Sequence, residues 1–203
     1  MNILPTPKEC ANPGRPLPEL NEVLHPSVTE WLPVKVKDLI LDYLIIKASF
    51  MEHGIGNSSL SDFSYLITPA FKALEGTLLQ IAEQLGFPLK EVNYKVGVVF
   101  SEEQLEKYYR DTLDKLESLA IEKRLDVKQW LDNARRILHH MRHAPAHYRA
   151  EGKKTYTAAF QTGEMILGTI NEMCRSLLAA GLLKPDPAAA LLEVTGLKGL
   201  FKP

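Results

Sequence analysis

Hydrophobic residues recur every three to four positions along five stretches of the chain, and polar segments with glycine or proline separate them. This spacing is typical of amphipathic α-helices that bury one face. The three most regular stretches cover residues 34 to 53, about 65 to 85 and about 155 to 182. The residues predicted to point inward are Val36, Leu39, Ile40, Tyr43, Leu44 and Phe50 in the first stretch, Leu74, Leu78, Ile81 and Leu85 in the second, and Phe160, Leu167, Ile170, Cys174 and Leu177 in the third.

Proline and glycine indicate where these helices begin and end. The first helix begins after Pro33 and ends near His53. In the second, Pro69 suits a first turn, so the sequence favours a start near Thr68, which is a candidate N-cap. Gly86 follows the last inward residue and is typical of a helix C-terminus.

The middle of the chain predicts two more helices and one irregular segment. Ser101-x-x-Gln104 has the pattern of a capping box, and a further helix starts near Asp126. The only strand-like run covers residues 91 to 100, and a lone strand is not stable by itself. The sequence therefore predicts an all-α bundle of about five helices, with a short irregular or strand-like insert near residues 87 to 100.

The distribution of proline predicts three regions. Residues 1–33 form a Pro-rich N-terminal arm, residues 34–183 form the helical domain, and residues 184–203 form a tail with a short helix. Proline lacks a backbone donor and stops helices, so residues 1 to 20, which carry five prolines, are predicted to be extended or disordered.

Composition limits the class of protein. A formal net charge of -1 argues against wholesale wrapping of nucleic acid, although a local basic groove remains compatible with it. No apolar run approaches the roughly 20 residues of a membrane span. The first residues do not follow the pattern of a secretory signal. Cys10 and Cys174 are too few for a disulfide framework, so the sequence predicts a cytoplasmic protein.

The stretch RHAPAH, from Arg142 to His147, carries the most distinctive chemistry. Pro145 breaks the helical pattern between the two end residues, which allows both side chains to face one cleft. A guanidinium fork suits a phosphate, and a histidine titrates near neutral pH. Together they fit metal-independent RNA cleavage, in which the ribose 2′-OH attacks the adjacent phosphorus while a cation stabilises the developing charge.

RHAPAH resembles the R-x4-H signature of HEPN-domain ribonucleases, in which a polar residue such as His143 usually follows the arginine. The resemblance implies an endoribonuclease in which Arg142 holds the scissile phosphate and His147 transfers a proton. It implies no metal and no cofactor.

The segment TPAFKALEG, with Asp62 upstream, is similar to the corresponding helix of the RNase LS toxin family. That resemblance implies that Asp62, Lys72 and Glu75 accompany Arg142 and His147 in the active site. Lysine stands at the basic position where the family is expected to have arginine, and it is a weaker bidentate clamp. The family also implies a homodimer with a shared cleft, a toxin or antiphage role and a cognate antitoxin protein.

Several cations near the motif are candidate contacts to the RNA backbone. These residues are Arg135, His143, Arg149, Lys153 and Lys154.

Plainer interpretations of the same residues stay open. Cations often gather at a helix C-terminus, where they suit the dipole. Lys72 and Glu75 are three apart, which is also the spacing of an exposed ion pair, and Asp62 suits a loop or a cap. His139 and His143 have the spacing of a zinc pair, but no nearby Cys or carboxylate completes a set of ligands.

A non-catalytic helical module is the alternative function. In it RHAPAH would bind a nucleotide or a protein partner, including a nucleotidyltransferase antitoxin. HEPN partners of such antitoxins carry a tyrosine two positions after the histidine, where this chain has Arg149.

Overall fold

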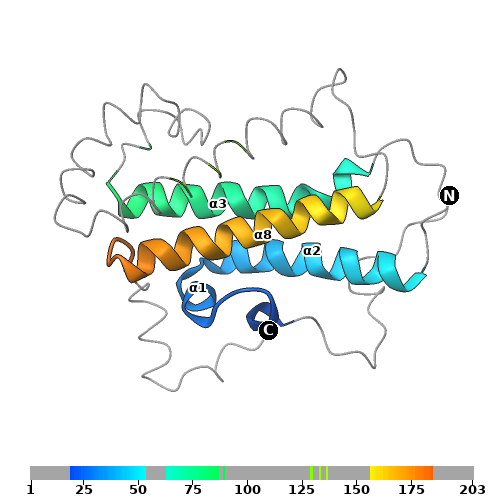
Figure 1. The fold of residues 1–203 in the computed structure, drawn as a ribbon, viewed down its shortest axis with the longest axis horizontal. Helices are drawn as coiled ribbons and strands as arrows, with labels where there is room; N and C mark the ends of the chain where they lie inside the picture. The colour runs from blue at the N-terminus through cyan, green and yellow to red at the C-terminus, as the bar shows by residue number, and fades with distance from the viewer. Residues whose placement is uncertain are drawn as a thin grey trace.

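The computed structural model describes residues 19–53, 63–86, 89, 129, 133, 136 and 156–184. Within these residues the regular structure is helical and contains no strand, which confirms the all-α class for this part of the chain (Figure 1). The elements are η1 (Leu20–Glu22), α1 (Pro26–Trp31), α2 (Val34–His53), η3 (Ser64–Ile67), α3 (Thr68–Gln84) and α8 (Tyr156–Ala179).

Three long helices form the framework, and α8 lies in front of the space between α3 and α2 in Figure 1. Helices α3 and α8 run parallel. Phe63, just before η3, contacts Tyr156 at the start of α8, and Gln84 at the end of α3 bonds to Lys184 just after α8. Helix α2 is antiparallel to both, because Phe50 near its end packs against Phe160 near the start of α8.

Two glycines allow the helices to approach closely. A Cβ atom at Gly76 of α3 would lie 2.8 Å from a methyl carbon of Val36 in α2. A Cβ atom at Gly163 of α8 would overlap the ring of Tyr43, also in α2. Real Cβ contacts are longer than this, so each glycine lets a larger side chain of α2 pack against the backbone of its neighbour.

The predicted bounds of the long helices agree closely with the structure. Helix α2 has the predicted bounds, and α3 ends one residue before Leu85, with Gly86 beyond it at a φ of 79°. The predicted N-cap is wrong by one position: Ile67 is the cap and Thr68 is the first helical residue, because the 3-10 turn η3 leads directly into α3.

The core contains most of the residues predicted to point inward. All five inward residues of α8 are buried, as are Leu74, Leu78 and Ile81 of α3. The three inward residues that stay partly exposed pack against the edge of this core. They are Leu39, Phe50 and Leu85.

Residues 20 to 33, which lie within the predicted Pro-rich N-terminal arm, contain two regular elements. Here η1 and α1 are helical, and Val28 and Trp31 are buried in the same core as the long helices. Pro26 suits the first turn of α1, and the imidazole of His25 caps it. The apolar spacing from Leu24 through Val28 to Trp31 gives this segment one face to bury.

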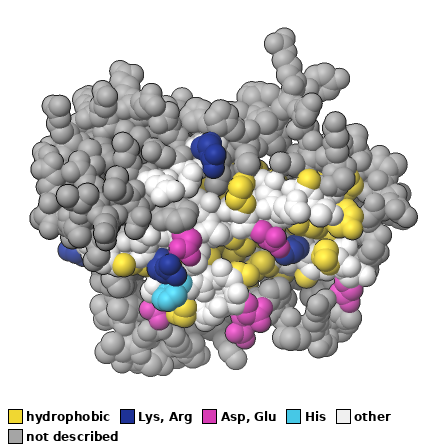
Figure 2. Space-filling view, in the orientation of Figure 1, with side chains coloured by type: hydrophobic (Ala, Val, Ile, Leu, Met, Phe, Trp, Pro, Cys, Tyr) yellow, Lys and Arg dark blue, Asp and Glu magenta, His cyan; other side chains and the backbone are white. Residues whose placement is uncertain are grey.

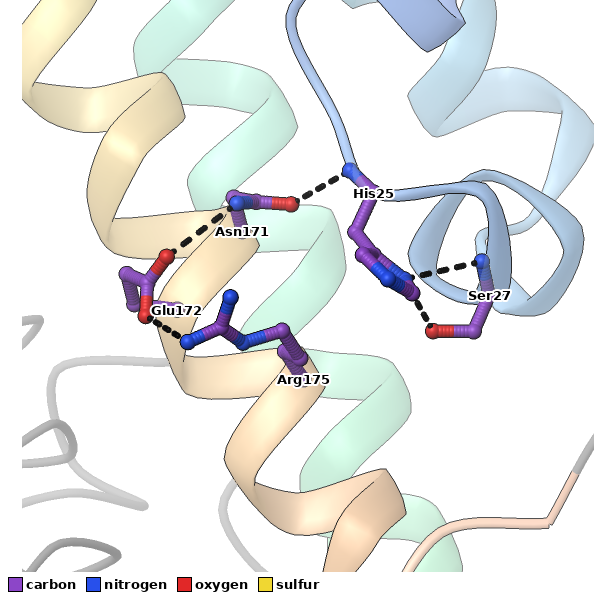
Figure 3. Close-up of polar contacts among 5 residues, drawn as sticks. All are labelled: His25, Ser27, Asn171, Glu172 and Arg175. Atoms are coloured by element: carbon purple, nitrogen blue, oxygen red, sulfur yellow. Dashed lines mark hydrogen bonds and ion pairs between the residues drawn. The ribbon is translucent and has the colours of Figure 1, made fainter.

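A polar network joins this segment to α8 (Figure 3). The side-chain oxygen of Asn171 accepts from the backbone N–H of His25 at 2.7 Å. The Asn171 amide donates to Glu172 at 3.3 Å, and Glu172 pairs with Arg175 at 3.0 Å. On the other side, His25 Nδ1 accepts from the backbone N–H of Ser27 at 3.3 Å.

The remaining fold predictions fall outside the described residues. These are most of the two helices predicted in the middle of the chain, the insert at residues 87 to 100 and the short helix of the tail. Gln129, Asn133 and Arg136 are helical, in agreement with the helix predicted to start near Asp126. Gln129 and Arg136 are exposed, and Asn133 is partly buried.

Candidate functional site

Helix α3 carries the two predicted site residues that the structure describes. Lys72 is exposed and Glu75 is half-buried, whereas Ala73 and Leu74 between them are buried. Both therefore lie off the buried stripe, as their spacing predicts. Lys72 takes part in no ion pair with the described residues, so its ammonium group is available to a ligand.

The other predicted site residues lie outside the described part of the chain. They are Asp62, Arg135, Arg142, His143, His147, Arg149, Lys153 and Lys154. Two of their neighbours in sequence are described and lie in contact. Phe63, which follows Asp62, and Tyr156, nine positions after His147, have ring centroids 6.4 Å apart in an edge-on arrangement.

This contact belongs to a cluster of aromatic rings at the end of the bundle where α3 and α8 begin. Tyr156 contacts Phe160 at 6.2 Å between centroids, and Phe160 in turn contacts Phe50 at 6.0 Å and Tyr43 at 6.4 Å. Edge-on pairs at these separations are the favoured geometry for aromatic rings. The ring contacts of this cluster pack the start of α8 against the segment just before η3 and α3.

Buried polar groups beside the cluster are paired. The phenol of Tyr43 donates to the carbonyl of Phe160 at 3.0 Å. Burial, with a smaller contribution from the charge of Glu164, raises the pKa of Tyr43 far above its ordinary value. Lys47 forms an ion pair with Glu164 at the surface between α2 and α8. These groups stabilise the scaffold, since each already has its partner inside the fold.

Tyr65 is the site candidate that sequence reasoning missed. The sequence places it only at the start of the second helix, whereas the structure puts it in η3 with 52% of its surface exposed. It makes no ring contact with the described residues, in contrast to Phe63 and Tyr156. No local pattern in the sequence indicates this exposure, which the structure also shows for Thr68 and Lys72, three and seven residues later.

Figure 2 shows that the surface of the described helices mixes cationic, acidic and apolar side chains on this face. A ligand that bound the described helices on the face drawn in Figure 2 would therefore meet individual side chains rather than a broad field of one sign.

The described residues carry neither a metal-binding cluster nor a membrane-spanning helix. They contain no group of three or more His, Cys, Asp or Glu side chains suited to a metal ion. No helix among them is long and apolar enough to cross a membrane. Cys174 is fully buried, and burial raises the pKa of its thiol, which disfavours the reactive thiolate.

Comparison of the chain with family models, with curated proteins and with solved structures gives no significant match. The predicted function therefore rests on the residues of the chain and on their placement.

Proposed function

We propose that this protein is a metal-independent endoribonuclease of the HEPN type, built on a bundle of about five helices and acting as a toxin or antiphage effector. Arg142 and His147 carry the chemistry, and Asp62, Lys72 and Glu75 complete the active site. The proposal includes a homodimer and a cognate antitoxin protein as partners, and a cytoplasmic location.

One observation in the structure supports this proposal. The chain enters α8 nine residues after His147 and enters η3 two residues after Asp62. Tyr156, at the start of α8, and Phe63, just before η3, are in contact. Lys72 and Glu75 lie in the first half of α3, which starts at the same end of the bundle. Glu75 is seven residues into α3, or about 10 Å along the helix axis.

The proposed reaction uses groups that are ordinary for RNA cleavage. A base removes the proton of a ribose 2′-OH, and this oxygen attacks the adjacent phosphorus. The bond to the 5′-oxygen breaks, that oxygen takes up a proton, and a 2′,3′-cyclic phosphate remains. His147 takes part in proton transfer, and Arg142 stabilises the charge on the phosphate oxygens. Glu75 orients a catalytic group or the ribose, while Lys72 and the cations Arg135, His143, Arg149, Lys153 and Lys154 bind phosphates.

The first test is cleavage of a mixed-length RNA in excess EDTA. We expect the wild type to cut and to leave cyclic-phosphate ends. His147→Ala should be slower by roughly 10²- to 10⁴-fold, as for the loss of a general acid or base. Arg142→Ala should be slower by roughly 10²- to 10³-fold. Circular dichroism must show that both variants are folded.

Variants of described residues, each with a matched control, distinguish proposed active-site residues from other residues of the surface. Glu75→Gln should reduce cleavage, whereas Glu83→Gln, at an exposed glutamate of the same helix, should not. Lys72→Ala should reduce cleavage of the RNA, whereas Lys35→Ala, at an exposed lysine of α2, should not.

Three results would contradict the proposal. Cleavage that EDTA abolishes would point to a metal and to the histidine cluster. Cleavage that persists in His147→Ala would remove this residue from the site. A folded wild type that cleaves no RNA would favour the non-catalytic binding module.

A further inference from the structure

We infer that Tyr65, Thr68 and Lys72 form a binding surface for single-stranded RNA, in which the ring of Tyr65 stacks on a base and Lys72 binds a phosphate. This inference rests on the proposed ribonuclease function and names the form of RNA that the site accepts. The three residues are called the η3–α3 surface below.

The geometry of the helices puts these three side chains on one side. In a 3-10 turn, residues three apart are eclipsed, so Tyr65 and Thr68 point the same way. From Thr68 to Lys72 an α-helix turns by 400°, a net offset of about 40°. All three residues are exposed, and the buried residues of α3 occupy the opposite side.

The spacing along the axis suits an extended strand. Tyr65 and Lys72 are separated by about 12 Å, counted from the rise per residue of the two kinds of helix. A single strand of a few nucleotides spans such a separation, so a base on Tyr65 leaves a phosphate further along the strand within reach of Lys72. The hydroxyl of Thr68 lies between them, where it can bond to the sugar or the phosphate.

The chemistry of the surface matches a flexible single strand better than a duplex. Every base has a flat face that stacks on an aromatic ring, but only an unpaired base exposes that face. The ring of Tyr65 is free to receive one, because it is 52% exposed and packs on no described ring. A tyrosine loses little conformational freedom on binding, since it has only two side-chain torsions.

The surface shares a residue with the proposed active site. Tyr65 is three residues after Asp62, and Lys72 belongs to the proposed catalytic set. A base held on Tyr65 would therefore fix the position of the strand close to the groups that act on it.

Equilibrium binding tests this inference apart from cleavage. Full-length protein carrying His147→Ala is titrated into a labelled short oligouridylate and into an abasic ribose-phosphate strand of the same length. Adding Tyr65→Ala should weaken binding of the oligouridylate by roughly 5- to 150-fold, the range for one stacked base. It should leave binding of the abasic strand unchanged, since that strand has nothing to stack.

Companion variants assign each contact. Tyr65→Phe keeps the ring and should retain binding, while Tyr65→Leu keeps apolar bulk without the ring and should lose it. Lys72→Ala should weaken binding of both strands. The slope of log affinity against log salt should fall in magnitude by about 0.7, the value for one phosphate contact on a single strand. Val34→Ala removes an apolar side chain that is 70% exposed at the opposite end of the bundle. It should change the affinity for neither strand.

Two outcomes would overturn the inference: no binding of the oligouridylate by the His147→Ala protein, or equal effects of Tyr65→Ala on both strands in a protein of unchanged melting temperature. The proposed nuclease is judged separately. Cleavage by the wild type without a stacking contribution of Tyr65 would remove only the η3–α3 surface. Tyr65-dependent binding without cleavage would keep the surface and remove the nuclease.

Discussion

At the scale of single residues, the contact between Tyr43 and Gly163 shows how one absent side chain supports the bundle. The ring of Tyr43 is fully buried and is held by its hydrogen bond to the carbonyl of Phe160, so it has no room to move aside. Gly163 supplies the space for the ring. A glycine in a helix costs roughly 1 kcal/mol relative to alanine, and this site accepts that cost.

The variant Gly163→Ala should therefore destabilise the protein by about 1–3 kcal/mol, the usual range for overpacking, despite the better helix propensity of alanine. Gly168→Ala on the same helix is the matched control. A Cβ there meets nothing within 4 Å, so this change should stabilise the protein by up to about 1 kcal/mol. Thermal melting measures both. A shift of the melting temperature in the same direction in both variants would show that Tyr43 does not fill the space over Gly163.

At the scale of elements, the side chain of Gln84 joins three segments at the end of the bundle opposite the aromatic cluster. Its oxygen accepts from the indole N–H of Trp31 at 3.3 Å and from the backbone N–H of Lys184 at 3.0 Å. Its amide donates to the carbonyl of Lys184 at 3.2 Å. One glutamine thus connects α1, α3 and the turn after α8.

Loss of this side chain should loosen α1 more than the long helices. Gln84→Ala leaves the indole N–H of the buried Trp31 without its acceptor, and we expect a loss of about 1–3 kcal/mol in the free energy of unfolding. Amide hydrogen exchange should become faster in α1 than in the middle of α8. Gln80→Ala, one turn earlier in α3, is the control. Equal exchange in α1 for both variants would mean that Gln84 does not hold this segment.

At the scale of the whole molecule, the proposed nuclease requires two copies of the chain. We expect light scattering to give a mass of twice 22.8 kDa for the purified protein. The specific activity should fall when the protein is diluted below the dissociation constant of the dimer, because a shared cleft is lost with the partner. A monomer whose specific activity does not depend on concentration would contradict this expectation, and it would leave the chemistry of Arg142 and His147 to be judged by the cleavage assay.

The sequence by itself determined the local features of this protein. The apolar spacing of α2, α3 and α8, with Pro33 and Gly86 beside them, predicts their ends and most of their buried residues, because a helix depends mainly on near neighbours in the chain. The type and spacing of Arg142 and His147 likewise define the proposed chemistry without any tertiary structure.

Only the tertiary structure decided which surfaces meet. No local pattern shows that α1 belongs to the core, that α3 and α8 run parallel or that Tyr43 needs Gly163, since these depend on contacts between segments far apart in sequence. The exposure of Tyr65 has the same origin. An aromatic residue at a helix start would be expected to join the core, but Phe63 and Tyr156 contact each other at this end, and Tyr65 remains at the surface.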